Sequence, residues 1–215
     1  MTGKASKKAL MISLLSILAI FILLRSCHIL LHIGDVYTSC FSKEFRVNEN
    51  DHINNDNISE IAYMRMLKHF AAMDTQLTDL SFITGFTELE SFSVVSSSND
   101  PAYVITDIPS LKNALSLGYV YLFADVNNLD FLVDSQKLYD VTVVSYNKEI
   151  TDISGLRNKP ELRNIVLKNV KCSDYSIFLA LPSLNYLYLE GTILPDNIKE
   201  ELEKKGIRIE NFIEN

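Results

Sequence analysis

The fold is decided by two similar stretches of sequence, Leu162-Arg-Asn-Ile165-Val-Leu167 and Leu184-Asn-Tyr-Leu187-Tyr-Leu189. Each has the form LxxLxL, with an apolar residue at every L. Because successive side chains of a strand point to opposite faces, the last two apolar residues of each stretch share one face. Each stretch therefore predicts a short strand with one buried face and one exposed face.

The pattern occurs five times between residues 75 and 215. Its copies can be aligned on a polar residue that stands ten positions before the first leucine: Asp79, Asp107, Asn128, Asp152 and Asp174. Apolar residues, with Cys172 and Tyr175 counted among them, stand two positions before each of these and one, four, ten, thirteen and fifteen positions after. The spacing between copies is 21 to 28 residues. Such a period predicts a solenoid whose turns stack their strands into a parallel sheet.

In these copies the chain resembles the leucine-rich-repeat proteins, particularly the short repeats of bacterial surface proteins such as internalins. The resemblance covers residues 75–215 and implies an α/β fold, a leucine-rich-repeat solenoid with a parallel sheet on its concave face. One feature departs from the family. The asparagine expected three residues after the last leucine is replaced by Tyr146, Val170 and Thr192. This departure predicts less regular turns.

Polar residues mark the turns and the C-terminal end of the solenoid. Thr-Asp or Ser-Asp pairs at 78–79, 106–107, 151–152 and 173–174 predict capping of backbone N–H groups. The alternative, a calcium or acid–base site, is less favoured because each aspartate comes from a separate turn beside buried residues. Asp196 predicts the start of a helix that ends at Gly206, followed by a last strand at 207–209.

The first 33 residues differ from the rest in composition. Residues 9–24 are apolar except for two serines, and apolar residues resume at 29–33 after a polar break. A membrane-spanning helix needs about 20 apolar residues, so we expect a single transmembrane signal anchor over residues 9–33. Lys4, Lys7 and Lys8 predict a basic tail, residues 1–8, in the cytosol. The C-terminal domain would then lie outside the cytoplasm at the cell membrane.

Two alternatives for this segment stay open. It could be a cleaved signal peptide, although no small-x-small cleavage site follows the apolar run. It could also carry a lipid on Cys27, since Leu24-Arg-Ser-Cys27 resembles a bacterial lipobox with an unsuitable arginine. Both alternatives deliver the rest of the chain to the outside. A Cys27–Cys40 disulfide is a further alternative in that compartment.

Two segments connect the apolar run to the repeats. Residues 34–57 are polar and without periodicity, which predicts a mobile spacer. Asn57-Ile58-Ser59 is a glycosylation sequon that matters only in a eukaryotic secretory pathway. Residues 58–74 have apolar side chains at mostly helical spacings, beginning with Ile58 and Ile61. They predict an amphipathic helix that caps the first edge of the solenoid.

The outward positions of the predicted strands supply the candidate site. We expect a protein-binding patch on the concave face, since exposed tyrosines are enriched in protein interfaces. Its residues are Tyr119, Tyr121, Val166, Tyr186 and Tyr188. The alternative is that aromatic residues simply suit strands.

The composition excludes several classes of function. The net charge is −7, and no acidic residue precedes Asp35, so the remainder is strongly acidic and would repel nucleic acid. The four histidines have no metal-ligand spacing, and no phosphate loop or nucleophile elbow occurs. Cys172 stands in an apolar column and is interpreted as core packing.

The sequence therefore predicts a membrane-anchored leucine-rich-repeat module, with no cofactor and no catalytic activity. Its expected function is recognition of, or adhesion to, a protein or a glycan outside the cytoplasm. The alternative is a structural or accessory subunit of a membrane complex that assembles through the anchor helix.

Overall fold

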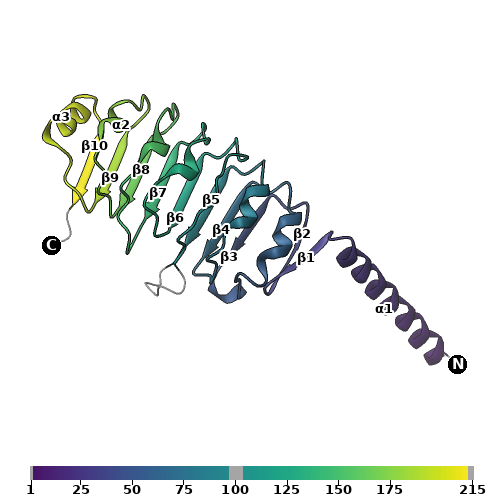
Figure 1. Ribbon diagram of the computed structural model, residues 1–215. Helices are drawn as coiled ribbons and strands as arrows, with labels where there is room; N and C mark the ends of the chain where they lie inside the picture. The colour runs from purple at the N-terminus through teal and green to yellow at the C-terminus, as the bar shows by residue number, and fades with distance from the viewer. Residues whose placement is uncertain (1, 97–103, 213–215) are drawn as a thin grey trace.

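The computed structural model describes residues 2–96 and 104–212. They form an elongated α/β solenoid in which eight parallel strands lie side by side in chain order (Figure 1). The strands are β3 (Glu44–Val47), β4 (His69–Met73), β5 (Ser91–Val95), β6 (Tyr119–Phe123), β7 (Asp140–Val144), β8 (Asn164–Lys168), β9 (Tyr186–Glu190) and β10 (Arg208–Phe212). The predicted stacked parallel sheet is confirmed.

The chain between successive strands returns through short helical segments. Five described 3-10 helices, at Glu49–Asp51, Ile58–Tyr63, Ser81–Gly85, Asp130–Leu132 and Ser154–Leu156, serve the first turns. Two α-helices, α2 (Ser176–Leu179) and α3 (Asp196–Lys204), serve the last. The sheet therefore keeps one face free of helices, and this open face carries the outward strand residues.

The core is built from the aligned apolar positions. All of them are buried except Ile108, which is half-buried and packs against the same core. Strand register stacks equivalent residues directly, as in the series Phe92, Val120, Val141, Ile165 and Leu187. Burying each such side chain contributes about 1.5–3 kcal/mol, so the column pattern is the main source of stability.

Adjacent turns also approach each other closely on the helical side. A Cβ atom at Gly155 would lie 1.9 Å from the carbonyl oxygen of Leu129 in the preceding turn. No side chain fits at that distance, so glycine is required there for the turns to stack.

The predicted capping is confirmed at three of the four pairs, 78–79, 151–152 and 173–174, and Asn128 caps its turn in the same way. The side-chain oxygens of Asp79, Asn128, Asp152 and Asp174 each accept a hydrogen bond from the backbone N–H two residues later, at 2.8 to 3.2 Å.

The helix and strand predicted at the C-terminal end of the solenoid are also confirmed. Helix α3 begins at Asp196, Gly206 has a left-handed φ of 76°, and β10 follows.

The expectation of a mobile spacer over residues 34–57 is wrong. This segment contains β2 (Val36–Ser39), β3 and a short 3-10 helix at Glu49–Asp51. Phe45 and Val47 alternate with exposed residues in β3 and are buried. The polar run that follows forms a capping box, in which Asn48 and Asp51 exchange hydrogen bonds, and therefore acts as an ordered turn.

The amphipathic helix expected over residues 58–74 is also wrong. A 3-10 helix ends at Tyr63, and His69–Met73 forms strand β4 of the sheet. Ile58 and Ile61 are three residues apart, which matches the three-residue turn of a 3-10 helix. Phe70 and Ala72 are buried at strand spacing, so this segment is an additional turn of the solenoid.

The apolar segment at 9–33 is not one helix. Helix α1 (Thr2–Ser26) projects from the N-terminal end of the solenoid, and β1 (Leu30–Ile33) then pairs antiparallel with β2 (Figure 1). Leu31 and Ile33 are fully buried against the solenoid, which explains why apolar residues resume there. Within residues 2–96 and 104–212, no helix has the length and apolar character needed to cross a membrane.

Candidate functional site

The outward residues of the strands form straight rows across the open face. One row runs through Ser93, Tyr121, Thr142, Val166 and Tyr188, and the row beside it through Ser91, Tyr119, Asp140, Asn164 and Tyr186. All ten side chains are half-buried. They pack against their cross-strand neighbours and still leave part of their surface open to solvent.

The five predicted site residues do not form one continuous patch. Val166 and Tyr188 are direct neighbours in register, whereas Thr142 separates Val166 from Tyr121. Strands in a sheet lie about 4.8 Å apart, so Tyr121 and Tyr188, three strands apart, are about 14 Å from each other. The face therefore carries two aromatic clusters, which are separated by β7 and β8.

The first cluster is centred on β6. The Tyr121 and Phe123 rings meet edge to face with centroids 5.6 Å apart, and Phe123 meets Tyr146 in the same way at 5.7 Å. Such geometry is favourable for aromatic pairs. We call Tyr121, Phe123 and Tyr146 the β6 cluster.

The second cluster is centred on β9, and we call Tyr188, Phe212, Lys168 and Glu190 the β9 cluster. The Tyr188 and Phe212 ring centroids are 5.7 Å apart, and the Lys168 ammonium lies 5.9 Å from the Tyr188 ring centroid. Lys168 forms an ion pair with Glu190 at 2.9 Å, and the Tyr188 hydroxyl donates to Glu190 at 2.7 Å. Hydrogen bonding to Glu190 raises the pKa of Tyr188, which therefore stays a neutral donor.

A groove of about 400 Å³ lies between the two clusters at the carboxyl ends of β7, β8 and β9. It is lined by Val144, Ser145, Tyr146, Lys168, Asn169, Glu190 and Gly191. Burial alone would raise the pKa of Glu190, but hydrogen bonds from Lys168 and Tyr188 keep it below the usual value. The groove therefore combines an aromatic wall with a fixed ion pair.

Tyr146 is held in this groove by a buried carboxylate. Asp125 accepts hydrogen bonds from the backbone N–H groups of Tyr146 at 2.7 Å and of Asn147 at 2.9 Å. It also accepts from the side chains of Asn147 and Ser145. Burial alone would raise the pKa of Asp125, and the bonds from Asn147, Tyr146 and Ser145 together lower it. Asp125 thus positions a site residue without belonging to the exposed surface.

The second row differs from the first because its centre is polar. Asn164 donates to Asp140 at 2.8 Å, and Tyr119 and Tyr186 flank this pair. Burial raises the pKa of Asp140, and burial followed by the charge of Asp140 raises the pKa of Tyr119. Tyr186 instead lies under Arg208, whose guanidinium carbon is 5.5 Å from the ring centroid.

Sequence reasoning missed Tyr146, Lys168 and Phe212 as parts of this surface. Tyr146 stands where the repeat family has its asparagine, so its departure from the pattern was a usable signal. Lys168 and Phe212 lie two residues after the outward positions Val166 and Glu210 of their strands, and only the folded structure shows that they reach Tyr188.

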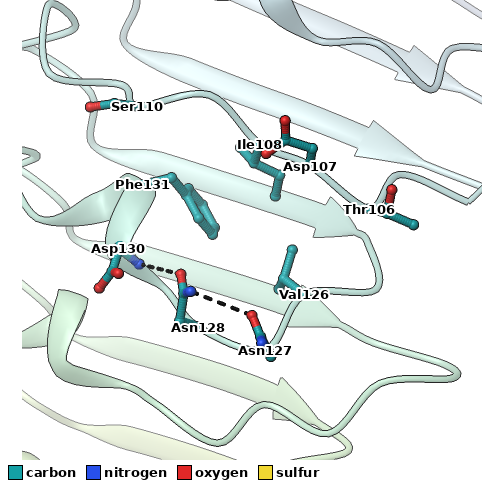
Figure 2. Close-up of a pocket in the computed structure, with 9 residues that line it drawn as sticks. All are labelled: Thr106, Asp107, Ile108, Ser110, Val126, Asn127, Asn128, Asp130 and Phe131. Carbon is teal, nitrogen blue, oxygen red and sulfur yellow. Dashed lines mark hydrogen bonds between the residues drawn. The ribbon is translucent and has the colours of Figure 1, made fainter.

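A smaller hollow, of about 240 Å³, lies on the turn side (Figure 2). It is lined in part by Asp107, Asn128 and Asp130, and Figure 2 shows the Asn128 side chain accepting a hydrogen bond from the Asp130 backbone N–H. The polar groups there include the caps that close the turns. In the described part of the chain, no group of three His, Cys, Asp or Glu side chains could hold a metal ion.

The three cysteines are free thiols, so the Cys27–Cys40 disulfide is not formed. Cys172 is buried in its predicted core column, and burial raises the pKa of its thiol. A buried, protonated thiol is a poor nucleophile, which agrees with a packing role.

Comparison with solved structures finds this architecture in internalins of Listeria monocytogenes. Internalin C2 matches with a TM-score of 0.56 and 20% identity, over 73% of this chain and 75% of that one. The chain has a leucine-rich-repeat fold. A second internalin, inlF, matches with a TM-score of 0.51 and 18% identity, over 72% of this chain and 50% of that one. The sequence itself matches no protein-family model and no curated protein.

Proposed function

We propose that this leucine-rich-repeat chain is a non-catalytic recognition module that binds a protein on the open face of its sheet. The observation that carries the proposal is the pair of aromatic clusters that flank the groove at β7 to β9. Their rings are held by neighbouring rings and by the Lys168–Glu190 ion pair, so little side-chain entropy is lost on binding. Half-buried, ordered tyrosines of this kind are typical of protein interfaces.

We further propose that α1 attaches the module to a membrane, with the solenoid outside the cytoplasm. Ten large apolar side chains between Met11 and Leu23 are 41 to 62% exposed and lie on all sides of the helix. A helix that is apolar all round is stable only when another apolar medium surrounds it. The basic residues Lys4, Lys7 and Lys8 precede the apolar run, and such residues favour the cytoplasmic side.

The exposed apolar surface of α1 also favours a second candidate function. The chain would then be a structural or accessory subunit that assembles with membrane partners through α1. Fusion of residues 1–26 to an unrelated domain separates the two functions. Only an accessory subunit would keep its partners in that fusion, as detected by co-purification from the membrane.

The recognition function is tested by removing one tyrosine from each cluster. The full chain is cross-linked on intact cells, and its adducts are compared with those of the Tyr121→Ser/Tyr188→Ser variant. We expect the variant to lose an adduct that the parent forms, by roughly tenfold or more, as hot-spot tyrosines contribute strongly to binding. Leu115→Ser/Val133→Ser, which changes two exposed apolar residues of the turns, is the matched control and should keep the adduct.

Three outcomes matter. An adduct that is lost only in the tyrosine variant and is destroyed by protease supports protein recognition. An adduct that resists protease and is removed by glycosidase assigns a glycan ligand instead. Equal adducts in all three chains, with unchanged thermal unfolding, would contradict the assignment of the open face.

A further inference from the structure

Helix α1 is fixed to the solenoid by a clamp of charged groups. The Arg25 guanidinium donates to both carboxylate oxygens of Glu60, at 2.5 and 2.7 Å, and to the carbonyl oxygen of Leu30 at 3.1 Å. Glu60 also accepts from the backbone N–H of His32 at 2.8 Å. The hydrogen bond with Arg25 is the main cause that lowers the pKa of Glu60. A bidentate pair fixes orientation as well as distance, so α1 leaves the solenoid in a defined direction.

The β1–β2 hairpin turns an aromatic face toward α1. His32 and Tyr37 are opposite each other in the hairpin, and their rings stack at 4.2 Å on the face away from buried Leu31 and Ile33. The Tyr37 ring also lies 6.1 Å from the ring of Phe21 in α1. Since a helix rises about 1.5 Å per residue, Tyr37 lies about one turn along α1 from Arg25, beside its apolar part.

Other exposed apolar side chains belong to the same end of the solenoid. Tyr63 stacks on His28 at 3.9 Å, and the hydrogen bond from the Cys40 N–H to the Ile29 carbonyl brings Phe41 close to Ile29. We call Ile29, Tyr37, Phe41 and Tyr63 the cap surface. Their exposed fractions are 37, 56, 64 and 44%, although the cap as a whole is built to close the end of a hydrophobic core. Exposed large apolar side chains gathered at one end of a solenoid indicate an interaction site.

We infer that the cap surface rests in the headgroup region of the bilayer that α1 enters. This inference depends on the proposed membrane attachment of α1 and adds a second point of contact. Tyrosine and histidine rings are apolar at one end and polar at the other, which suits the boundary between lipid and water. The cap surface is continuous with α1 through the Phe21–Tyr37 contact, so a bilayer that surrounds α1 reaches it directly.

A protein partner or a second copy of the chain fits these observations less well. Either would cover the cap surface and still leave the apolar side chains of α1 to be covered separately, on every side of the helix. A bilayer covers both at once. The Arg25–Glu60 clamp then keeps the solenoid at a fixed angle to the membrane and the open face of the sheet in a fixed direction.

The chain contains no tryptophan, so a single introduced indole reports its own surroundings. Three full-length variants are reconstituted in phosphatidylcholine vesicles: Tyr37→Trp in the cap surface, Leu18→Trp in α1 and Leu115→Trp in a central turn. Each is measured with lipids brominated near the headgroup and with lipids brominated deep in the acyl chains. Leu115 is 66% exposed and far along the chain from the cap, so it provides the unquenched control.

We expect the Tyr37→Trp chain to lose roughly half of its emission with the shallow bromine and less with the deep one, as for interfacial aromatic residues. Leu18→Trp should be quenched more by the deep bromine, and Leu115→Trp by neither. Quenching of Leu18→Trp without quenching of Tyr37→Trp would overturn the inference and leave the membrane attachment intact. Absence of quenching in Leu18→Trp would overturn the membrane attachment itself.

A second probe protects the test against local misfolding at Tyr37. Phe41→Trp changes another residue of the cap surface, which lies in a turn and contributes no buried ring. It should show the same shallow quenching as Tyr37→Trp. If both cap variants unfold at the same temperature as the parent and neither is quenched, the cap surface lies outside the headgroup region and the inference is wrong.

Discussion

Two buried charged side chains, Asp125 and Lys159, are accommodated in opposite ways. Asp125 follows β6 and receives four hydrogen bonds from the loop at 145–147 in the next turn. Lys159 lies in the turn before β8, and its Nζ donates to the carbonyl oxygen of Val133 at 2.6 Å. Both side chains are almost completely shielded from solvent.

The difference lies in how far the hydrogen-bonding capacity of each group is used. A carboxylate that accepts several hydrogen bonds recovers most of the cost of leaving water, and the pKa of Asp125 is lowered in spite of burial. Burial is the main cause that lowers the pKa of Lys159, so the charged ammonium is disfavoured there. We infer that Asp125 organises its turn, whereas Lys159 mainly fills space with its aliphatic stem.

The largest effect is expected from Asp125→Ala. The substitution leaves the N–H groups of Tyr146 and Asn147 without their acceptor, and we expect it to lower the free energy of unfolding by about 3 kcal/mol. Urea unfolding monitored by circular dichroism measures the loss. Asp79→Ala, which removes the acceptor of an exposed turn N–H, is the control with a smaller expected loss. Equal losses in the two variants would show that the Asp125 network contributes no more than a cap.

The second effect concerns pH and the same carboxylate. The pKa of Asp125 is lower in the folded than in the unfolded chain. The carboxylate therefore contributes its full stabilisation of the fold at pH values above its pKa in the unfolded chain, about 3.9. It is lost as the pH falls through the folded value. We therefore expect the stability difference between the parent and Asp125→Asn to shrink on acidification, as measured by urea unfolding at several pH values. A difference that is constant through this range would contradict the lowered pKa.

The sequence predicted the solenoid because its apolar columns repeat at nearly constant spacing. One earlier turn was missed although the same pattern continues into it. Counted from Asn57, the positions one, four, ten, thirteen and fifteen later are Ile58, Ile61, Leu67, Phe70 and Ala72, all of them buried. Ala72 is a weak signal for a strand core, and the three-residue spacing of Ile58 and Ile61 also fits a helix. Helical periodicity was therefore given too much weight.

The candidate site was predicted only in outline. Strand alternation identified the outward tyrosines, since it needs no knowledge of distant contacts. The grouping of these tyrosines into two clusters depends on residues from separate turns, such as Phe123 with Tyr146 and Tyr188 with Phe212. The place of Tyr146 follows from loop geometry fixed by Asp125, and that of Phe212 follows from the pairing of β10 with β9. Local sequence does not contain that information.

A seventh buried column also escaped notice because polar residues interrupt it. Seven positions after the aligned polar residues stand Phe86, Ala114, Ser135, Lys159 and Leu181, and all are buried. Lys159 thus replaces an apolar residue in a core column. Its neighbour in the preceding turn, Ser135, has a buried hydroxyl with no hydrogen-bond partner among the described residues.

The smallest effect, and the only gain, is expected from Lys159→Met. Methionine has a similar volume and no charge, so we expect the free energy of unfolding at neutral pH to rise by about 1 kcal/mol. Because the folded pKa of Lys159 is lowered, the penalty for burying the charge is present at neutral pH. It disappears as the pH rises from the folded value to the unfolded one, about 10.4.

The gain should therefore decline as the pH is raised through this window, and urea unfolding of both chains at neutral and alkaline pH measures the decline. A gain that persists unchanged at alkaline pH would mean that packing, and not the charge, limits the parent. A loss of stability at neutral pH would mean that the hydrogen bond to Val133 outweighs the cost of burial, and that Lys159 resembles Asp125 after all.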